Sequence, residues 1–130
     1  MLNIYSFFHL NTSFSSIEKE KIPTLIKKCY WPLLNLIENN TDFKIALEAS
    51  GKTISDINAI DPQWVKKLSR LINSKNCEFI GSGYCQIISP SVPKEITEKN
   101  LQLGNEIYSK LLKIKPVLGL VGEQVFSKSM

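Results

Sequence analysis

Two residues of this 130-residue sequence end apolar runs with side chains capable of chemistry, Glu123 and His9. Glu123 follows the apolar stretch that begins at Leu118, and Gly119 and Gly122 leave room around it. Parallel α/β sheets and barrels place their reactive groups just past the carboxyl ends of the strands, so a carboxylate here suits catalysis. A carboxylate partly withdrawn from water needs a partner. An exposed loop glutamate fits the periodicity equally well.

Three further positions could bind a ligand. His9 is the sole histidine; its imidazole can donate and accept hydrogen bonds to sugar hydroxyls, although a structural histidine is the commoner case. Gly81-Ser82-Gly83-Tyr84 has no GK[ST] ending, which weakens a phosphate-loop interpretation. Its glycines would let a ligand approach the backbone closely, with Tyr84 as a stacking face. Alternatively, the glycines only form a tight bend after the strand. Glu48 alternates with apolar neighbours, so we expect it inside a barrel, where it needs a partner.

Strands and helices alternate along the predicted chain. Apolar periodicity and capping residues predict a strand over Ile4 to Leu10, a helix from Pro23 to Asn39 bent at Pro32, a strand over Lys44 to Ala49, a short helix capped by Thr53 or Ser55, a helix opening at Asp61-Pro62, a strand over Cys77 to Gly81, a helix from about Lys94 to Leu112, and a strand leading to Glu123. This order implies right-handed crossovers and a parallel sheet. The residues that follow its strands then meet at one end.

Composition excludes several classes of function. The net charge of +4 comes from lysines spread over several helices, which argues against nucleic-acid binding. No apolar run approaches the roughly 18 residues of a membrane span. Three cysteines without a CxxC pair or a signal peptide predict reduced thiols in a cytoplasmic protein. We expect no zinc site, since the one histidine lies far from every cysteine in sequence.

Three motifs resemble those of glycoside hydrolase family 57, the α-amylase and 4-α-glucanotransferase group. They are Phe8-His9-Leu10-Asn11, the stretch from Glu78 to Gln86 continuing to Glu95, and Leu120 to Phe126. The sequence departs from the family pattern at four positions. Leu10 and Asn11 replace glutamine and proline, Gln86 stands where many members have glutamate, and Phe126 stands where many have tryptophan.

The resemblance implies an α/β fold, the N-terminal part of an incomplete seven-stranded TIM-like barrel with about four parallel strands. Residues 1–130 would form one partial barrel domain, truncated at its C-terminus. The resemblance makes Glu123 the nucleophile of a retaining enzyme acting on α-glucans, with His9, Tyr84 and Gln86 as substrate-binding residues. Glu48 lies in none of the three motifs, and its alternation with apolar neighbours makes it a fourth expected substrate-binding residue. The resemblance implies no metal and no cofactor. Hydrolysis and transglycosylation both stay open.

The resemblance also implies a missing catalytic partner. The family's acid/base is an aspartate in a later motif, and none of Asp42, Asp56 and Asp61 follows a strand at the required end. We therefore expect the chain to be inactive alone. The expected partners are a carbohydrate and either the remainder of the barrel or another copy joined at open sheet edges, with no nucleic acid or membrane. The alternative is a non-catalytic α/β module that binds a sugar or a protein.

Overall fold

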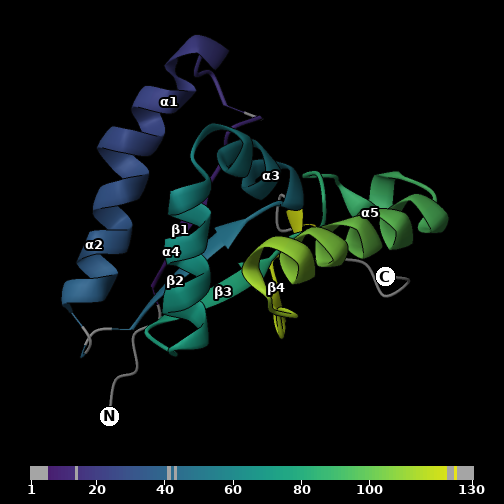
Figure 1. The fold of residues 1–130 in the computed structure, drawn as a ribbon. Coiled ribbons are helices and arrows are strands. Elements are labelled where there is room, and N and C mark those ends of the chain that lie inside the picture. The colour runs from purple at the N-terminus through teal and green to yellow at the C-terminus, as the bar shows by residue number, and fades with distance from the viewer. Residues whose placement is uncertain (1–5, 14, 41, 43, 123–124, 126–130) are drawn as a thin grey trace.

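The computed structural model describes residues 6–13, 15–40, 42, 44–122 and 125 (Figure 1). Strands and helices alternate along it. The main elements are β1 (Phe7–Leu10), α1 (Ile22–Leu25), the π-helix η2 (Ile26–Tyr30), α2 (Trp31–Asn39), β2 (Ile45–Ala49), α3 (Gly51–Ile60), α4 (Pro62–Asn73), β3 (Cys77–Gly81), α5 (Lys94–Ile107), the π-helix η4 (Tyr108–Leu112) and β4 (Leu118–Gly119); single turns of 3-10 helix cover Lys19–Lys21 and Ser89–Ser91. In the described part of the chain, no helix is both long enough and apolar enough to span a membrane.

The four strands form one open sheet in the order β1-β2-β3-β4, and every neighbouring pair is parallel. The register places His9 opposite Glu48 and Glu48 opposite Ile80. Ile80 in turn lies opposite Leu118. The predicted α/β architecture of four parallel strands alternating with helices is confirmed. All strand-end loops therefore lie at one edge of the sheet.

Alternate residues of the central strand β2 face opposite sides of the sheet. Ile45, Leu47 and Ala49 belong to the hydrophobic core beneath the helices. Ala46 and Glu48 face the other side, and they too are buried. Burial on both faces is typical of a central parallel strand, whose sequence is then nearly all apolar. Glu48 is the exception in this strand.

Helices α2 and α4 run side by side, and α5 packs against α3 (Figure 1). The apolar stripe of α4 recurs at helical spacing and buries Trp64, Val65, Leu68 and Leu71. Asp61 caps this helix, accepting a hydrogen bond from the Trp64 N–H at 3.2 Å, as the sequence predicted. Trp31 and Trp64 both pack, Trp64 with no exposed surface.

The start of α3 differs from the prediction of a cap at Thr53 or Ser55. Ser50 is the cap, and its hydroxyl oxygen accepts from the Thr53 N–H at 3.2 Å. The helix begins directly after β2 because the Gly51 N–H, at its first position, donates to the Gly83 carbonyl at 2.8 Å. The first N–H groups of a helix have no acceptor within the helix, and here the carbonyl of a distant loop accepts from one of them.

Two of the predicted long helices contain a π-helical turn. Segment η2 directly precedes the turn that holds Pro32, whose missing N–H removes one regular helical hydrogen bond. Segment η4 ends the last helix. Each π turn carries one buried tyrosine, Tyr30 or Tyr108. Strand β4 covers two residues, fewer than predicted. Strand β1 covers Phe7–Leu10, and its predicted start at Ile4 lies outside the described residues.

Candidate functional site

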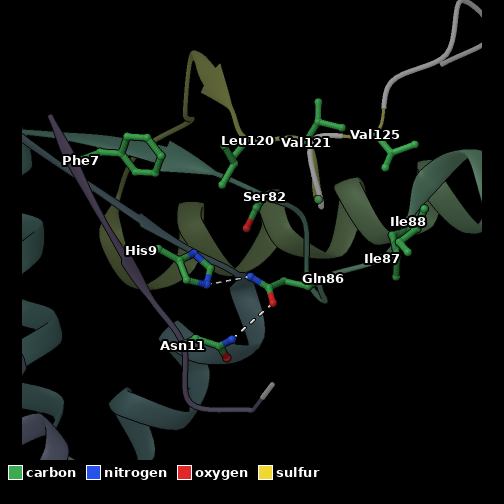
Figure 2. Close-up of a pocket in the computed structure, with 11 residues that line it drawn as sticks. Phe7, His9, Asn11, Ser82, Gln86, Ile87, Ile88, Leu120, Val121 and Val125 are labelled. Carbon is green, nitrogen blue, oxygen red and sulfur yellow. Dashed lines mark hydrogen bonds between the residues drawn. The ribbon is translucent and has the colours of Figure 1, made fainter. Parts of the chain in front are cut away.

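A cavity of about 960 Å³ lies at the carboxyl ends of the strands (Figure 2). Strand β1, the loop after β3 and the residues after β4 supply its walls. The described lining residues are Phe7, His9, Asn11, Ser82, Gln86, Ile87, Ile88, Leu120, Val121, Gly122 and Val125. Polar side chains line one wall and apolar side chains most of the rest, an arrangement typical of small-molecule sites.

His9 connects the sheet to this polar wall. Its Nδ1 is hydrogen-bonded to Glu48 Oε2, across the β1–β2 pairing that sets the two residues opposite each other. Its Nε2 lies 3.0 Å from Gln86 Nε2 (Figure 2). Glu48 has no exposed surface, whereas 39% of the His9 side chain is exposed. Glu48 therefore contacts His9 from behind and does not line the cavity.

Asn11 extends the polar wall beyond Gln86. Its Nδ2 donates to Gln86 Oε1 at 3.4 Å, and its Oδ1 accepts from the Ser13 N–H at 3.0 Å. Figure 2 shows His9, Gln86 and Asn11 in a row, with the side chain of Ser82 directed toward the same space. The Ser82 hydroxyl is buried and has no hydrogen-bond partner within the described residues. A ligand hydroxyl could satisfy it.

Tyr30 and Tyr108 support the loops that carry these residues. The Tyr30 hydroxyl accepts from the Asn11 N–H at 3.2 Å and donates to the Asn11 carbonyl at 3.0 Å. The Tyr108 hydroxyl lies 2.8 Å from the Ala49 carbonyl and 2.9 Å from the Gly83 carbonyl. It also accepts from the Ser82 N–H at 3.2 Å. Burial raises the pKa of Tyr30, and it raises the pKa of Tyr108 to about 12, so both hydroxyls keep the proton they donate.

Asn100 of α5 fixes the loop between β3 and Gln86. Its backbone carbonyl accepts from the Tyr84 N–H at 2.9 Å. Its side chain accepts from the Cys85 N–H at 2.7 Å and donates to the Cys85 carbonyl at 3.0 Å. The Lys52 N–H, in the first turn of α3, donates to the Tyr84 carbonyl at 2.8 Å. Gln86 therefore projects from a loop held by α3 and α5.

The structure brings together part of the predicted site. His9 and Gln86 line the cavity and touch each other. Tyr84 does not line it, and its ring packs near Gly51. Glu123 lies outside the described residues, although Gly122 before it is part of the lining. The catalytic role of Glu123 and the substrate-binding roles of the other four residues stay predictions.

Sequence reasoning did not assign Asn11 or Ser82 to the site. Both lie in motifs that it singled out: Asn11 follows His9 by two residues, and Ser82 stands between the two glycines before Tyr84. Their place directly after β1 and β3 was the available signal. Asp56 lies elsewhere, on α3, where it accepts from Thr12 and Ser13 and pairs with Lys52. Among the described residues no cluster of three potential metal ligands occurs.

Comparison with known protein families agrees with this arrangement. The model of glycosyl hydrolase family 57 matches residues 6–130. This chain belongs to glycosyl hydrolase family 57. The match includes both sides of the cavity, from β1 to the residues after β4.

Two α-amylases are similar to this chain in sequence. The α-amylase of Pyrococcus furiosus is 29% identical over 80 residues, which are 62% of this chain and 12% of that enzyme. The α-amylase of Pyrococcus abyssi is 24% identical over 85 residues, 65% of this chain and 13% of that enzyme. The matched region is thus about an eighth of the length of either enzyme.

Two solved structures share the fold. The 4-α-glucanotransferase of Thermococcus litoralis superposes with a TM-score of 0.84 at 18% identity, covering 96% of this chain and 19% of that one. A structure described as T48 deacetylase with substrate superposes with a TM-score of 0.64 at 11% identity, covering 95% of this chain and 50% of that one. The four parallel strands of this chain and their helices therefore share the fold of one part of each of these larger structures.

Proposed function

We propose that this chain is the N-terminal part of a retaining carbohydrate-active enzyme acting on α-glucans. The observation that carries the proposal is the cavity at the strand ends, with its wall of His9, Gln86 and Asn11, in a family 57 chain. Neutral imidazole and carboxamide groups are well suited to sugar hydroxyls, because each can donate and accept. The similar α-amylases and the glucanotransferase favour an α-glucan as the sugar.

In this proposal Glu123 is the nucleophile. Its carboxylate would attack the anomeric carbon while the glycosidic oxygen leaves, giving a glycosyl-enzyme intermediate. A second carboxyl, roughly 5 Å away in retaining enzymes, would protonate the leaving oxygen and later take a proton from water or from an acceptor sugar. The polar wall would hold the sugar hydroxyls during both steps.

The described lining of the cavity contains no carboxylate. Glu48 is buried behind His9, and Asp56 is held by Thr12, Ser13 and Lys52. We therefore propose that the acid/base lies outside this chain and that the 130 residues alone bind a glucan without turning it over. Release of reducing ends from a maltooligosaccharide by the wild-type chain, lost in Glu123→Gln, would contradict this part of the proposal.

Binding can be measured by calorimetry with maltoheptaose. We expect binding to the wild-type chain and about tenfold weaker binding to Gln86→Leu, because a lost hydrogen bond to a ligand costs about 1 kcal/mol or more. Gln102→Leu is the matched control: Gln102 is exposed on α5, bonded to Glu106, and its loss should leave affinity unchanged. No binding of maltoheptaose at millimolar concentration, or equal binding by Gln86→Leu, would overturn the glucan-site proposal.

A glycosyl fluoride separates the enzyme from the alternative, a non-catalytic sugar-binding module. Fluoride can leave without a proton from an acid, so α-maltosyl fluoride needs only the nucleophile for the first step. For an enzyme part we expect a maltosyl adduct on Glu123 by mass spectrometry, with fluoride released, and no adduct in Glu123→Gln. Binding of the sugar without any adduct would favour the module.

A further inference from the structure

Four hydrogen bonds follow one another along the polar wall of the cavity, and the donor is fixed in the two nearest Ser13. The Ser13 N–H donates to Asn11 Oδ1 at 3.0 Å, and Asn11 Nδ2 donates to Gln86 Oε1 at 3.4 Å. Gln86 Nε2 then faces His9 Nε2 at 3.0 Å, and His9 Nδ1 faces Glu48 Oε2. Four successive hydrogen bonds thus connect a backbone N–H in the loop after β1 to a carboxylate in β2.

The Ser13 end determines the direction of these hydrogen bonds, from donor to acceptor. A backbone N–H can only donate, so the oxygen of the Asn11 amide must point toward it and the Asn11 NH₂ must point toward Gln86. Gln86 then offers its oxygen to Asn11 and its NH₂ to His9. Because Gln86 donates, His9 Nε2 must be the unprotonated acceptor, and the imidazole proton must sit on Nδ1. That proton needs an acceptor on the sheet side.

Glu48 is that acceptor. It has no exposed surface, and its Oε1 is buried without a hydrogen-bond partner among the described residues. A buried carboxylate in the middle of an apolar central strand is costly unless it is paired, so the bond from His9 is its main compensation. The contact follows from the register of β1 and β2, which places His9 directly opposite Glu48.

We propose that Glu48 is a positioning residue. As the last acceptor of these hydrogen bonds it holds the His9 proton on Nδ1, which leaves Nε2 free to accept from Gln86 in the orientation that Asn11 imposes, with the second amide N–H of Gln86 available in the cavity. The cavity wall then donates N–H hydrogen bonds to acceptor oxygens of the ligand, such as the hydroxyl or ring oxygens of a sugar. This ligand preference rests on the proposed glucan site, whereas the proton position can be measured without any sugar.

The sole histidine makes the test unambiguous. Nitrogen-15 NMR of the full chain reads the protonation of both His9 ring nitrogens, and the urea-unfolded chain gives the reference for a solvent-exposed imidazole. We expect the folded chain to show the imidazole proton on Nδ1 and an unprotonated Nε2. A proton on Nε2, or on both nitrogens, would overturn the proposal.

Two substitutions of Glu48 separate positioning from packing. In Glu48→Leu the acceptor is lost, and we expect His9 to shift toward the unfolded reference with loss of the contact to Gln86. Glu48→Gln keeps an oxygen that can accept from Nδ1, so it should retain the wild-type proton position. A Glu48→Leu spectrum identical to wild type would overturn the proposal, as would a Glu48→Gln spectrum identical to that of Glu48→Leu.

Asn11→Asp tests the same series of hydrogen bonds from its solvent side. It does not disturb the buried strand β2, so it keeps the proposal testable if Glu48→Leu does not fold. Aspartate has no N–H to donate, so Gln86 must turn its NH₂ toward residue 11 and its oxygen toward His9. We expect His9 then to acquire a proton on Nε2. Asn105→Asp, the same change on an exposed position of α5, should leave the spectrum unchanged. An unchanged His9 signal in Asn11→Asp would overturn the inferred direction.

If the NMR results hold and maltoheptaose does not bind, only the proposed function fails.

Discussion

Gly104 of α5 lies against the backbone of Gly83 so closely that a Cβ added to Gly104 would stand 2.5 Å from the Gly83 carbonyl carbon. Gly83 has a φ of +84°, a conformation that few residues other than glycine adopt. Its carbonyl also accepts from the Gly51 N–H. The loop that carries Gln86 is therefore held where two glycines allow helix and loop to touch.

Gly104→Ala should destabilise the chain by about 1–3 kcal/mol, because the new methyl group meets rigid backbone. The sign is informative, since Gly to Ala inside a helix normally stabilises by about 1 kcal/mol. Urea unfolding followed by circular dichroism measures the change. In the control, Gly119→Ala, the nearest atom to a new Cβ is 3.7 Å away, so we expect little effect. Equal or greater stability of Gly104→Ala would show that this contact is not close in solution.

Tyr108→Phe should cost about 1–3 kcal/mol of unfolding free energy, because the buried Ala49 and Gly83 carbonyls and the Ser82 N–H lose a shared partner. Hydrogen exchange should also become faster at the Ser82 amide. Tyr84→Phe removes the same atom from a partly exposed side chain and should leave stability nearly unchanged. A Tyr108→Phe protein as stable as Tyr84→Phe would contradict the role assigned to this hydroxyl.

Cys77 should make the chain less stable at alkaline pH. Burial raises the pKa of this thiol from 9.0 to about 12 in the folded chain. Between these values the unfolded chain loses the thiol proton while the folded chain keeps it, so unfolding becomes easier as pH rises. The stability associated with the neutral thiol is complete below pH 9 and lost toward pH 12.

Cys77→Ala should therefore show a shallower loss of unfolding free energy than wild type as the pH rises above 9.0, whatever its stability at neutral pH. Urea titrations at several pH values give the slope. Cys29→Ala replaces an exposed cysteine and should keep the wild-type slope. Identical slopes for wild type and Cys77→Ala would rule out a buried neutral thiol.

Asp61 should contribute to stability through two separable bonds. One carboxylate oxygen accepts from the Trp64 N–H at 3.2 Å, and the other accepts from Trp31 Nε1 at 2.7 Å. Asp61→Ala removes both and should cost about 2 kcal/mol. Asp61→Asn keeps the cap but turns an N–H toward Trp31, so its cost should be smaller. Thermal unfolding with tryptophan fluorescence measures both; an Asp61→Asn loss equal to that of Asp61→Ala would place the effect in the Trp31 bond.

Local sequence predicts much of this fold because its apolar runs are short and sharply ended. The strand at Cys77–Gly81 lies between polar residues and a Gly-Ser-Gly bend, and its predicted and observed bounds agree. The start of α3 was harder, since Ser50, Thr53 and Ser55 are all capping residues. The choice depends on the bond between the Gly51 N–H and the Gly83 carbonyl, which joins distant parts of the chain.

The site was predictable in place but not in detail. Strand ends indicated His9 and Gln86, and a buried Glu48 was expected to need a partner. That the partner is His9 depends on the register between β1 and β2, which no local pattern specifies. The supporting role of the Tyr108 hydroxyl was missed because its partners, the Ala49 and Gly83 carbonyls and the Ser82 N–H, come from segments far away in the sequence.

The His9 contacts span 39 residues to Glu48 and 77 residues to Gln86. Contacts of such long sequence separation form only after the intervening chain has been ordered, because loop closure costs entropy before the contact repays it. The polar wall of the cavity therefore reports on the assembly of β1, β2 and the loop after β3 together. The single imidazole of this chain is thus a built-in probe of when its folding is complete.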